Sequence, residues 1–279
     1  LLKVSDHVYQ FTFPAGEAYK NLDTVQDLFQ CLIENGLDRK SLVVALGGGV
    51  TGDLSGFGAA AYLRGIDFIQ IPTTLLAQVD SSIGGKTGVD FDCYKNMVGA
   101  FHQPKMVYMN LSVLKSLTEE QFACGMGEVI KHGLIRDREY FDWILSHEKD
   151  ILAHDPEMLA LMIQESCLIK REVVELDPTE QNERATLNFG HTLGHAIEKL
   201  SGYSISHGHA VAMGMVVMCR AAYSLGYSQE NCTPPLLQAL DACHLPSACP
   251  YDAAALAKAA LSDKKRRGDN LTLILPLRM

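Results

Sequence analysis

The sequence lacks the marks of several protein classes. Its eight cysteines include no CxxC pair and no spacing typical of a small disulfide-bonded domain, which favours a reducing compartment. It has no run of about 18 uninterrupted apolar residues, and its start, LLKVSDHVYQF, does not have the cationic residues and long apolar stretch of a signal peptide. We therefore expect a cytoplasmic protein that does not cross a membrane.

An excess of positive charge is also missing. The 24 Lys and Arg residues are outnumbered by 33 Asp and Glu residues, which gives a formal net charge of −9 at pH 7. A surface for nucleic acid or anionic lipid would need the opposite balance, because both partners favour basic side chains. We expect neither partner, so any cationic site must be local.

The composition does support a substantial core. The chain has 279 residues, of which 47% are hydrophobic and 20% charged, and this is typical of an ordinary globular protein. We find no internal repeat and no low-complexity tract. Because the chain is longer than a typical single domain, we expect two domains or one large α/β unit.

The first part of the chain has the pattern of a β-turn-α-β unit. A helix is predicted over 21–36 and a buried strand over 41–46, followed by the glycine-rich turn GGGVTGD (47–53) and a helical run. Strands are predicted over 66–72 and 104–110, and such units build parallel sheets. Only about forty residues precede the glycine turn, so we expect the chain to begin inside a domain, without the usual first strand and helix.

After about residue 112 the pattern becomes helical. Pro-bearing stretches at 233–235 and 246–250 are predicted to be loops, and one late strand is predicted over 270–277. The predicted amphipathic helices are 119–135, 138–153, 156–176, 188–201 and 207–226.

Two segments of the first part could contact phosphate groups. In GGGVTGD the glycines would let backbone N–H groups approach a pyrophosphate at a helix N-terminus, although the turn could equally be tight packing with Asp53 as an N-cap. In QVDSSIGGKTGVDFDCYKNMVGAF (78–101), Lys86, Lys95 and Asn96 could bind a phosphate and Asp80 could accept from a hydroxyl. The alternative is that these lysines are solvated surface residues.

The helical part contains candidate metal ligands. In GMGEVIKHGLI (125–135), Glu128 shares a helix face with Lys131 and His132, and a half-buried carboxylate requires a cation. His191 and His195 are four residues apart in NFGHTLGHAIE. The segment SHGHA then adds two further candidates, His207 and His209. A Glu with two histidines and one open position is the ligand set of catalytic zinc sites, and the residues alone leave either member of the last pair as the third ligand.

The helical part of the chain also contains basic residues on both sides of these histidines. Lys170, Arg171 and Arg184 come shortly before the histidines, and DKKRR (263–267) is a basic cluster in an acidic protein. They could be solvated patches. If they converge on the metal, the site suits a substrate with several negative charges.

Taken together, these motifs resemble the 3-dehydroquinate synthases of the sugar-phosphate cyclase superfamily. The resemblance covers nearly the whole chain from about residue 14 and is most specific over 46–101. It is carried, in family order, by AGEAYK, LGGGVTGDLSGF, YLRGI, IPTTLLAQVDSSIGGKTGVD, KNMVGAF, GEVIKHG, LNFGHTLGHAIE, HGHAVAMGM and SDKK.

The resemblance implies an α/β NAD-binding domain with a parallel sheet (1–112) and a mainly α-helical metal- and substrate-binding domain (113–279), usually in a homodimer. It implies NAD as cofactor with Zn²⁺ or Co²⁺, and Glu128, His191 and His207 as the metal ligands. Arg64 would reach the neighbouring subunit's site. The implied cofactor contacts are Gly16, Glu17, Lys20, Gly49, Val50, Thr51, Gly52, Asp53, Thr73, Thr74, Lys86 and Lys95. The implied substrate residues are Asp80, Lys86, Lys95, Asn96, Lys131, Lys170, Arg184, Asn188, His195 and a lysine of the DKK pair, Lys264 or Lys265.

The activity that the resemblance implies is that of a lyase of the shikimate pathway, which leads to the aromatic amino acids. The small-molecule substrate would be a sugar-phosphate keto acid, 3-deoxy-D-arabino-heptulosonate 7-phosphate. It would become 3-dehydroquinate through transient oxidation by NAD, phosphate elimination, re-reduction and an intramolecular aldol reaction. The alternatives are a cyclase for a neutral-headed sugar phosphate, a polyol dehydrogenase that releases NADH, and a weakly active or silent fragment.

The chain departs from the family pattern in two places. His209 stands where the family commonly has Glu, and the family carries an additional strand and helix before the residue that is Leu1 here. The resemblance favours His207 over His209 as the third metal ligand, because the spacing from His191 to His207 matches the family's second metal histidine. It assigns His195 to the phosphate end of the substrate.

Overall fold

The computed structural model describes residues 5, 7–92, 94–261 and 271–278. The chain forms two compact units. The first runs up to Thr73 and includes Ser81–Asn110, and the second contains Thr74–Asp80 and the chain from Leu111 onward. The short segment Thr74–Asp80 thus belongs to the second unit although its sequence neighbours belong to the first.

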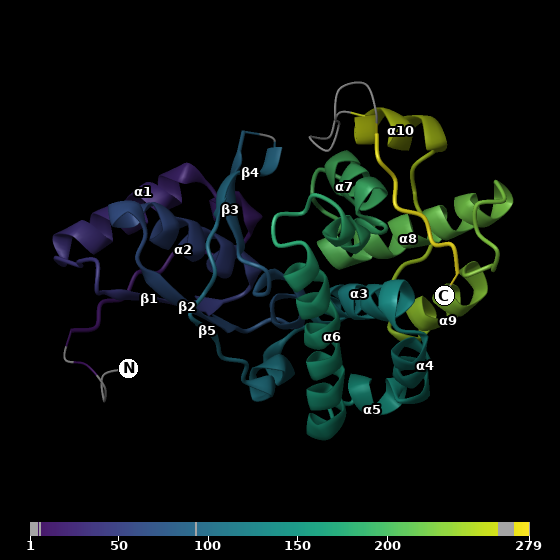
Figure 1. Cartoon of the computed structure of the whole chain (residues 1–279), viewed down its shortest axis with the longest axis horizontal. Coiled ribbons are helices and arrows are strands. Elements are labelled where there is room, and N and C mark those ends of the chain that lie inside the picture. Colours follow the sequence, from purple (N-terminus) through teal and green to yellow (C-terminus); the bar gives the residue numbers. More distant parts are fainter. Residues whose placement is uncertain (1–4, 6, 93, 262–270, 279) are drawn as a thin grey trace. The chain divides into compact units, whose positions relative to one another are not determined.

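The first unit is built on a three-stranded parallel sheet. The strands β1 (Leu42–Gly47), β2 (Asp67–Pro72) and β5 (Met106–Val107) lie in the order β1-β2-β5 (Figure 1). The helix α2 (Gly49–Ala61) connects β1 to β2 directly after the glycine-rich turn. The predicted β-turn-α-β unit with a parallel sheet is therefore confirmed.

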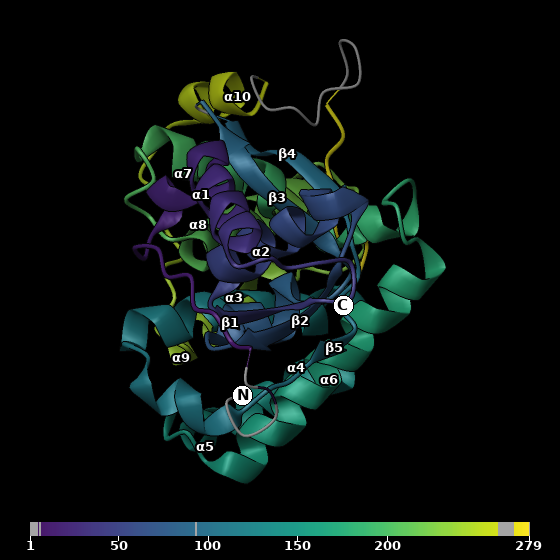
Figure 2. The ribbon, with the colours of Figure 1, turned by 90° about the vertical axis from the view of Figure 1, so that its left-hand side faces the viewer.

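Two helices cover this sheet because their apolar and small residues permit close packing. The helix α1 (Leu22–Glu34) begins at the N-cap Asn21 and shares a buried core with α2 and β2. Figure 2 shows α1 and α2 side by side. A Cβ at Gly58 would come within 2.6 Å of Leu28, and a Cβ at Gly56 within 2.5 Å of Thr87. The glycines of GFGAAA thus let α2 lie against both α1 and the strand that contains Thr87.

The segment expected to carry polar site residues also forms an antiparallel hairpin that the sequence reading missed. Its strands are β3 (Lys86–Phe91) and β4 (Tyr94–Phe101). Gly88 pairs with Gly99, and a Cβ at Gly99 would come within 2.2 Å of Thr87 O. The hairpin was missed because its glycines and lysines interrupt the alternation of apolar and polar residues that usually marks a strand. The predicted strand over 104–110 is shorter than expected, at Met106–Val107.

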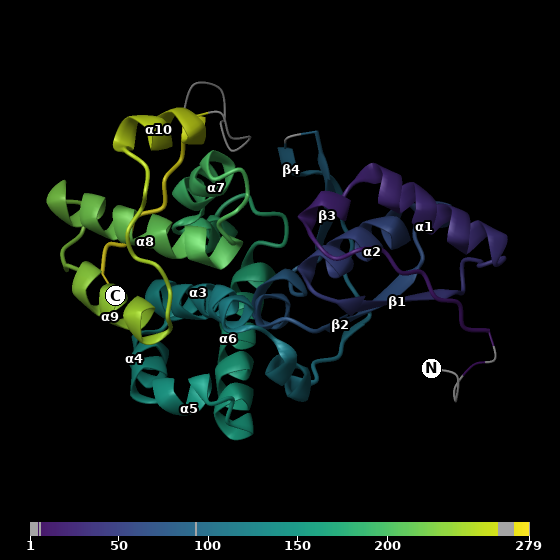
Figure 3. The same cartoon turned by 180° about the vertical axis from the view of Figure 1, so that it is seen from behind.

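The second unit is helical in its described residues (Figure 3). Its long helices confirm the predicted amphipathic runs, with one interruption at His147, whose ring nitrogen bonds the carbonyl of Trp143. The helices are α3 (Glu119–Arg136), α4 (Arg138–Ser146), α5 (Glu148–Leu152), α6 (Pro156–Leu176), α7 (His191–Leu200), α8 (His207–Ser224), α9 (Thr233–Ala242) and α10 (Ala253–Leu261).

Four details of the second unit were predicted wrongly. The expected loop at 233–235 is the start of α9, because proline is compatible with the first turn of a helix. The helix α10 was not predicted, and residues 271–277 form no strand. The helix expected over 188–201 begins only at His191 as α7, because Asn188 ends a 3-10 helix, η5 (Glu183–Asn188), and Gly190 (φ 77°) is not helical.

The structure also bears on the membrane prediction. Within the described part of the chain, every helix is too short or too polar to cross a bilayer.

Candidate active site

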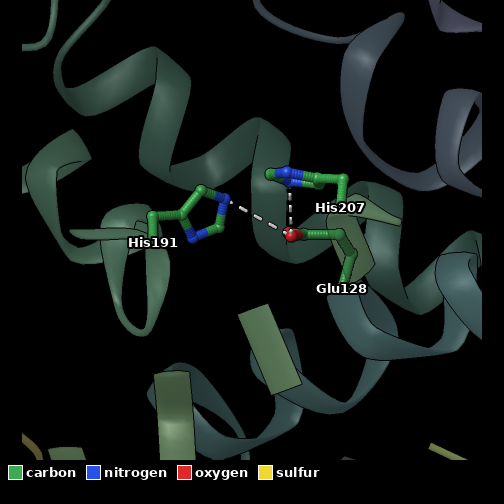
Figure 4. Close-up of side chains that lie close together, drawn as sticks. All are labelled: Glu128, His191 and His207. Atoms are coloured by element: carbon green, nitrogen blue, oxygen red, sulfur yellow. Dashed lines mark ion pairs between the residues drawn. The ribbon is translucent and has the colours of Figure 1, made fainter. Parts of the chain in front are cut away.

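Three helices of the second unit bring a carboxylate and two imidazoles to one point. Glu128 lies in the middle of α3, whereas His191 and His207 are the first residues of α7 and α8. Glu128 Oε1 lies 3.4 Å from His191 Nε2 and 3.5 Å from His207 Nε2. Figure 4 shows both rings directed at this one oxygen.

A glycine beside each of these residues permits the close approach of the helices. A Cβ at Gly127 would come within 2.8 Å of Gly208 O, and one at Gly208 within 1.9 Å of Cys124 O. A Cβ at Gly190 would come within 2.6 Å of Met215. Larger residues at these positions would push α3, α7 and α8 apart, so the glycines set the distances within the cluster.

The carboxylate of Glu128 is fully buried and is paired with a buried cation. Lys131, one turn further along α3, forms an ion pair with Glu128 Oε2 and also donates to Leu187 O at 2.8 Å. Burial opposes ionisation of Glu128, but the charges of Lys131 and His207 outweigh it and hold its pKa well below its ordinary range. The site therefore contains a permanent anion.

The hydrogen bonds of the two rings leave the same nitrogen of each directed at that anion. His191 Nδ1 lies 3.1 Å from Phe189 O, and His207 Nδ1 lies 3.4 Å from Glu198 Oε2. Since a carbonyl or carboxylate oxygen can only accept, Nδ1 carries the proton in each neutral ring and Nε2 offers a lone pair. Two lone pairs and a carboxylate oxygen then face one another, which requires a cation between them.

A divalent ion fits this arrangement. Ligands about 2.0–2.2 Å from a tetrahedral zinc ion are about 3.3–3.6 Å apart, and both distances to Glu128 Oε1 fall in that range. Without an ion, burial lowers the pKa of His207, but its bonds to Glu128 and Glu198 dominate and raise it to about 10. A proton then takes the position that the ion would fill.

The other two histidines of the cluster lie differently. The ring centroid of His195 is 5.7 Å from that of His191 and 6.1 Å from that of His207, so it stands beside the site. His209 belongs to none of the groups of metal-ligand geometry found in the described residues. It lines a groove of about 290 Å³ together with Glu120, Ser204, Ile205, Met213, Pro246, Ala248 and Pro250.

Predicted substrate residues form a second charged pair in the same unit, of which Lys170 is buried and Asp80 half-buried. Asp80, in the π-helical turn η3 (Ala77–Ser81), accepts a bond of 2.6 Å from Lys170 of α6, which also bonds the carbonyl oxygen of Asp80. Burial opposes ionisation of Asp80, but Lys170 outweighs it and holds its pKa below its usual range. The two charges neutralise one another here, so a substrate anion would have to compete with Asp80 for Lys170.

A loop before α7 positions two further predicted residues. The side-chain oxygens of Asp177 accept from the backbone of Gln181, Asn182 and Arg184 at 2.7–3.1 Å. Arg184, which is 1% exposed, donates to Pro178 O at 2.7 Å, and Asn188 donates to Glu180 at 2.6 Å. Sequence reasoning missed Asp177, Glu180 and Glu198, although a carboxylate four residues from a basic or amide residue could have drawn attention to the first two.

The first unit brings together part of the predicted cofactor set. Lys20 is buried, and its amino group lies 2.7 Å from Asp53, 2.5 Å from Asn96 Oδ1 and 3.9 Å from Glu17. Lys95 also pairs with Glu17, at 3.6 Å. Burial lowers the pKa of Lys20, but these carboxylates outweigh it and raise the pKa. The charged residues thus form one connected cluster beside the start of α2.

The glycine turn has the features of a binding turn. Gly48 is the N-cap of α2, and no side chain caps the helix there, so its first N–H groups are available to an anion. A Cβ at Gly52 would come within 2.9 Å of Gln70 Oε1, so a larger residue would displace this side chain. Val50 and Thr51 lie in the first turn. Thr73 donates its N–H to Gly47 O at 2.9 Å, and Thr74, in the second unit, caps the turn before η3.

Three other predicted residues lie in the described part of the first unit. Lys86 opens β3, and Gly16 precedes the short helix η1 (Glu17–Tyr19) with a φ of 117°. Arg64 is exposed, and it and Leu63 both have positive φ, at 70° and 50°. The predicted Lys264 or Lys265 lies outside the described residues.

Comparison with known proteins gives consistent matches. Residues 10–124 match the family described as 3-dehydroquinate synthase N-terminal, and residues 125–266 match 3-dehydroquinate synthase C-terminal. The 3-dehydroquinate synthase of Acetivibrio thermocellus is 47% identical over 270 residues, which is 96% of this chain and 75% of that protein. The 3-dehydroquinate synthase of Halorhodospira halophila is 48% identical over 270 residues, which is 96% of this chain and 76% of that protein.

Solved structures agree. A 2-deoxy-scyllo-inosose synthase complexed with carbaglucose-6-phosphate, NAD⁺ and Co²⁺ is 32% identical with a TM-score of 0.85, over 94% of this chain and 74% of that one. A 2-epi-5-epi-valiolone synthase from Streptomyces hygroscopicus with NAD⁺ and Zn²⁺ bound is 28% identical with a TM-score of 0.85, over 91% and 71%. A maleylacetate reductase from Agrobacterium tumefaciens, at 16% identity and a TM-score of 0.61 over 90% and 75%, shares the fold alone.

Proposed function

The chain belongs to the 3-dehydroquinate synthase family, and we propose that it converts 3-deoxy-D-arabino-heptulosonate 7-phosphate into 3-dehydroquinate and inorganic phosphate. It would then be a carbon–oxygen lyase of aromatic amino acid biosynthesis. The observation that carries the proposal is the convergence of Glu128, His191 and His207 on one point of a unit that also buries Lys131, Lys170 and Arg184. A substrate with both a carboxylate and a phosphate requires such cations.

Glu128, His191 and His207 would hold Zn²⁺ or Co²⁺, and the first unit, which contains the parallel sheet, would hold NAD. When bound, the ion would polarise substrate hydroxyl oxygens and NAD would oxidise and re-reduce the substrate carbon. Lys131 keeps Glu128 ionised and fixes its orientation through the ion pair and the bond to Leu187 O. The ligand carboxylate is thereby prepared before any ion binds.

The remaining buried charges would bind and orient the substrate. Lys170 would exchange Asp80 for the substrate carboxylate, with Arg184 as the second cation, and Asp80 would then accept a hydrogen bond from a substrate hydroxyl. His195, beside the two ligand histidines, would transfer or hold a proton at the phosphate end. Asn188 would donate to the substrate from its position beside Glu180.

Residues of the first unit, with Thr74 and a lysine of the second, would act on the cofactor and the phosphate. Glu17, Lys20, Asp53 and the first turn of α2 would contact NAD, together with Gly16, Thr73, Thr74 and Lys95. Lys86 and Asn96 would contact phosphate, and Lys264 or Lys265 would add a cation. Arg64, exposed on its own subunit, would complete the neighbouring site in a homodimer. All seven cysteines in the described part of the chain are free, which supports a cytoplasmic enzyme.

The likeness to 2-deoxy-scyllo-inosose synthase makes a cyclase for a neutral-headed sugar phosphate the second candidate. The burial of both Lys170 and Arg184 favours the keto acid, since two cations in the unit that carries the proposed ion site suit a substrate carboxylate. A dehydrogenase is supported less, because the reductase likeness extends to the fold alone.

Phosphate release tests the proposal. The purified chain is given the heptulosonate phosphate with NAD and Zn²⁺, and phosphate and absorbance at 340 nm are followed together. We expect phosphate release that requires both NAD and the ion, without accumulation of NADH, because the hydride returns to the substrate. Stoichiometric NADH would indicate a dehydrogenase, and turnover of only a sugar phosphate without a carboxylate would indicate the other cyclase.

A further inference from the structure

Glu198 is a buried carboxylate to which neither the sequence motifs nor the proposed ligand set gives a role. It lies in the last turns of α7, its side chain is 3% exposed, and Oε2 is 3.4 Å from His207 Nδ1. Its carbonyl oxygen accepts from Ser201 Oγ at 2.9 Å and from the N–H of Tyr203 at 2.8 Å. These bonds fix the end of the helix that carries Glu198.

The carboxylate also lies close to a second histidine. A ring nitrogen of His195, an oxygen of Glu198 and a ring nitrogen of His207 lie within 4.8 Å of one another. His195 and Glu198 are three residues apart on α7 and therefore share a helix face. Glu198 is thus placed to orient two rings that the proposed function uses differently.

Glu198 does not share the ion position of Glu128. It faces Nδ1 of His207, whereas Glu128 faces Nε2 of the same ring. The two nitrogens of an imidazole point in divergent directions, so an ion held by Nε2 is turned away from Glu198. A carboxylate on the far nitrogen of a ligand histidine fixes the tautomer and increases the basicity of the ligand nitrogen.

We propose that Glu198 is a positioning residue for both His207 and His195. Through the contact with His207 Nδ1 it fixes the orientation of the ring and directs Nε2 at Glu128, which sets the affinity for the ion. Through His195 it fixes the ring at the edge of the site, which sets the rate of proton transfer. The second part rests on the proposed function, whereas the first requires only that the site binds a divalent ion.

Zinc affinity tests the first part without substrate. The full chain is stripped of metal and titrated with Zn²⁺ against a chromogenic chelator, for the unmodified protein, Glu198→Gln and Glu198→Ala. We expect affinity to fall by about 10-fold for Gln, whose amide oxygen can still accept from Nδ1, and by up to about 100-fold for Ala. Glu175→Gln, the same change at an exposed carboxylate of α6, is the matched control and should bind as the unmodified protein does.

A purely structural role predicts a different result. Glu198→Gln would then unfold at a lower temperature with unchanged zinc affinity, and that result would overturn the proposal. If the Gln variant does not fold, Glu198→Asp is used, because it keeps the charge but shortens the reach to Nδ1. Weaker zinc binding by a folded Asp variant supports the proposal, and unchanged binding contradicts it.

Kinetics at saturating Zn²⁺ test the second part. We expect Glu198→Gln to lower kcat by about 10-fold, and to cause no further loss in a His195→Ala background, because both changes remove the same function. Losses that multiply would show that Glu198 does not act through His195. If the unmodified chain itself releases no phosphate, the proposed function fails. The zinc titration still decides the role of Glu198 toward His207 in that case.

Discussion

The backbone N–H of Gly208 donates a hydrogen bond of 3.2 Å to Sγ of Cys124, so α8 lies directly against α3. This contact is one residue from His207 on one helix and one turn from Glu128 on the other. The two helices cross at the point where they supply ligands. The geometry of the proposed metal site therefore depends on residues that carry no metal-binding group.

Gly208→Ala should therefore abolish tight zinc binding. The new Cβ would lie 1.9 Å from Cys124 O and 2.6 Å from its carbonyl carbon, so backbone must move. We expect a loss of about 1–3 kcal/mol in the free energy of unfolding from overpacking, together with a bound zinc content well below one per chain. Denaturant unfolding and metal analysis of the purified variant measure the two effects.

Gly202→Ala is the control for this substitution. Nothing lies within 4 Å of a Cβ at Gly202, but its φ of +60° makes alanine strained, at a cost of about 1–2 kcal/mol. It should lose similar stability and keep its zinc. Equal loss of zinc in both variants would mean that general destabilisation, rather than the helix crossing, empties the site.

The four clustered histidines should separate into three classes on substitution. His191→Ala and His207→Ala should lose both bound zinc and activity, because each removes a nitrogen that faces Glu128. His195→Ala should keep zinc but lose rate, and His209→Ala should keep most of both, because His209 lines a groove elsewhere. Zinc lost from His209→Ala and kept in His207→Ala would reverse the assignment of the third ligand.

The sequence predicted the elements of this fold better than their interruptions. The helices α3, α6 and α8 were predicted within one or two residues at each end because their apolar periodicity is long and, for α3 and α6, their N-caps are strong. The hairpin β3–β4 was missed because Gly88 and Gly99, which pair with one another, interrupt the alternation of apolar and polar residues in both strands. The helix α9 was missed because its prolines occupy a first turn, where they are tolerated.

The candidate site could be predicted in residue types but not in its contacts. Spacing identified Glu128 and His191 as candidates, yet the residues alone left His207 and His209 as alternatives. The direction in which each of these two side chains points depends on where α8 begins. The structure begins α8 at His207, so that ring faces α3 while His209 turns to the loop at 246–250. The pairing of Lys170 with Asp80 joins segments far apart in the chain, and no local pattern encodes it.

Neutral replacements of the two buried cations test the substrate carboxylate. Lys170→Met and Arg184→Met should each cost about 2–4 kcal/mol in kcat/KM, because a desolvated anion loses a charge-assisted partner. Arg171→Met is the control, since its side chain is 62% exposed and pairs only with Glu175 among the ion pairs described for it. Steady-state kinetics with a folded-protein check by circular dichroism measures the effect. Near-normal kinetics in both variants would favour the neutral-substrate cyclase.

Asp177 gives a prediction for acid stability. Hydrogen bonds from the backbone of Gln181 and Asn182 hold the pKa of Asp177 below its ordinary value. A carboxyl whose pKa is lower in the folded than in the unfolded chain stabilises the fold above its unfolded pKa of about 3.9, and that contribution is lost as pH falls further. Asp177→Asn removes the titrating group, so the difference in unfolding free energy between the unmodified protein and the variant should shrink as pH falls from 5 toward 2. Urea unfolding across this range measures the difference.

Asp155→Asn, at the N-cap of α6, is a matched control outside the loop, and it should leave the bonds from Arg184 to Asp177 and Pro178 intact. A difference that stays constant with pH would show that Asp177 acts through shape alone, because the neutral amide would then replace every contribution of its charge.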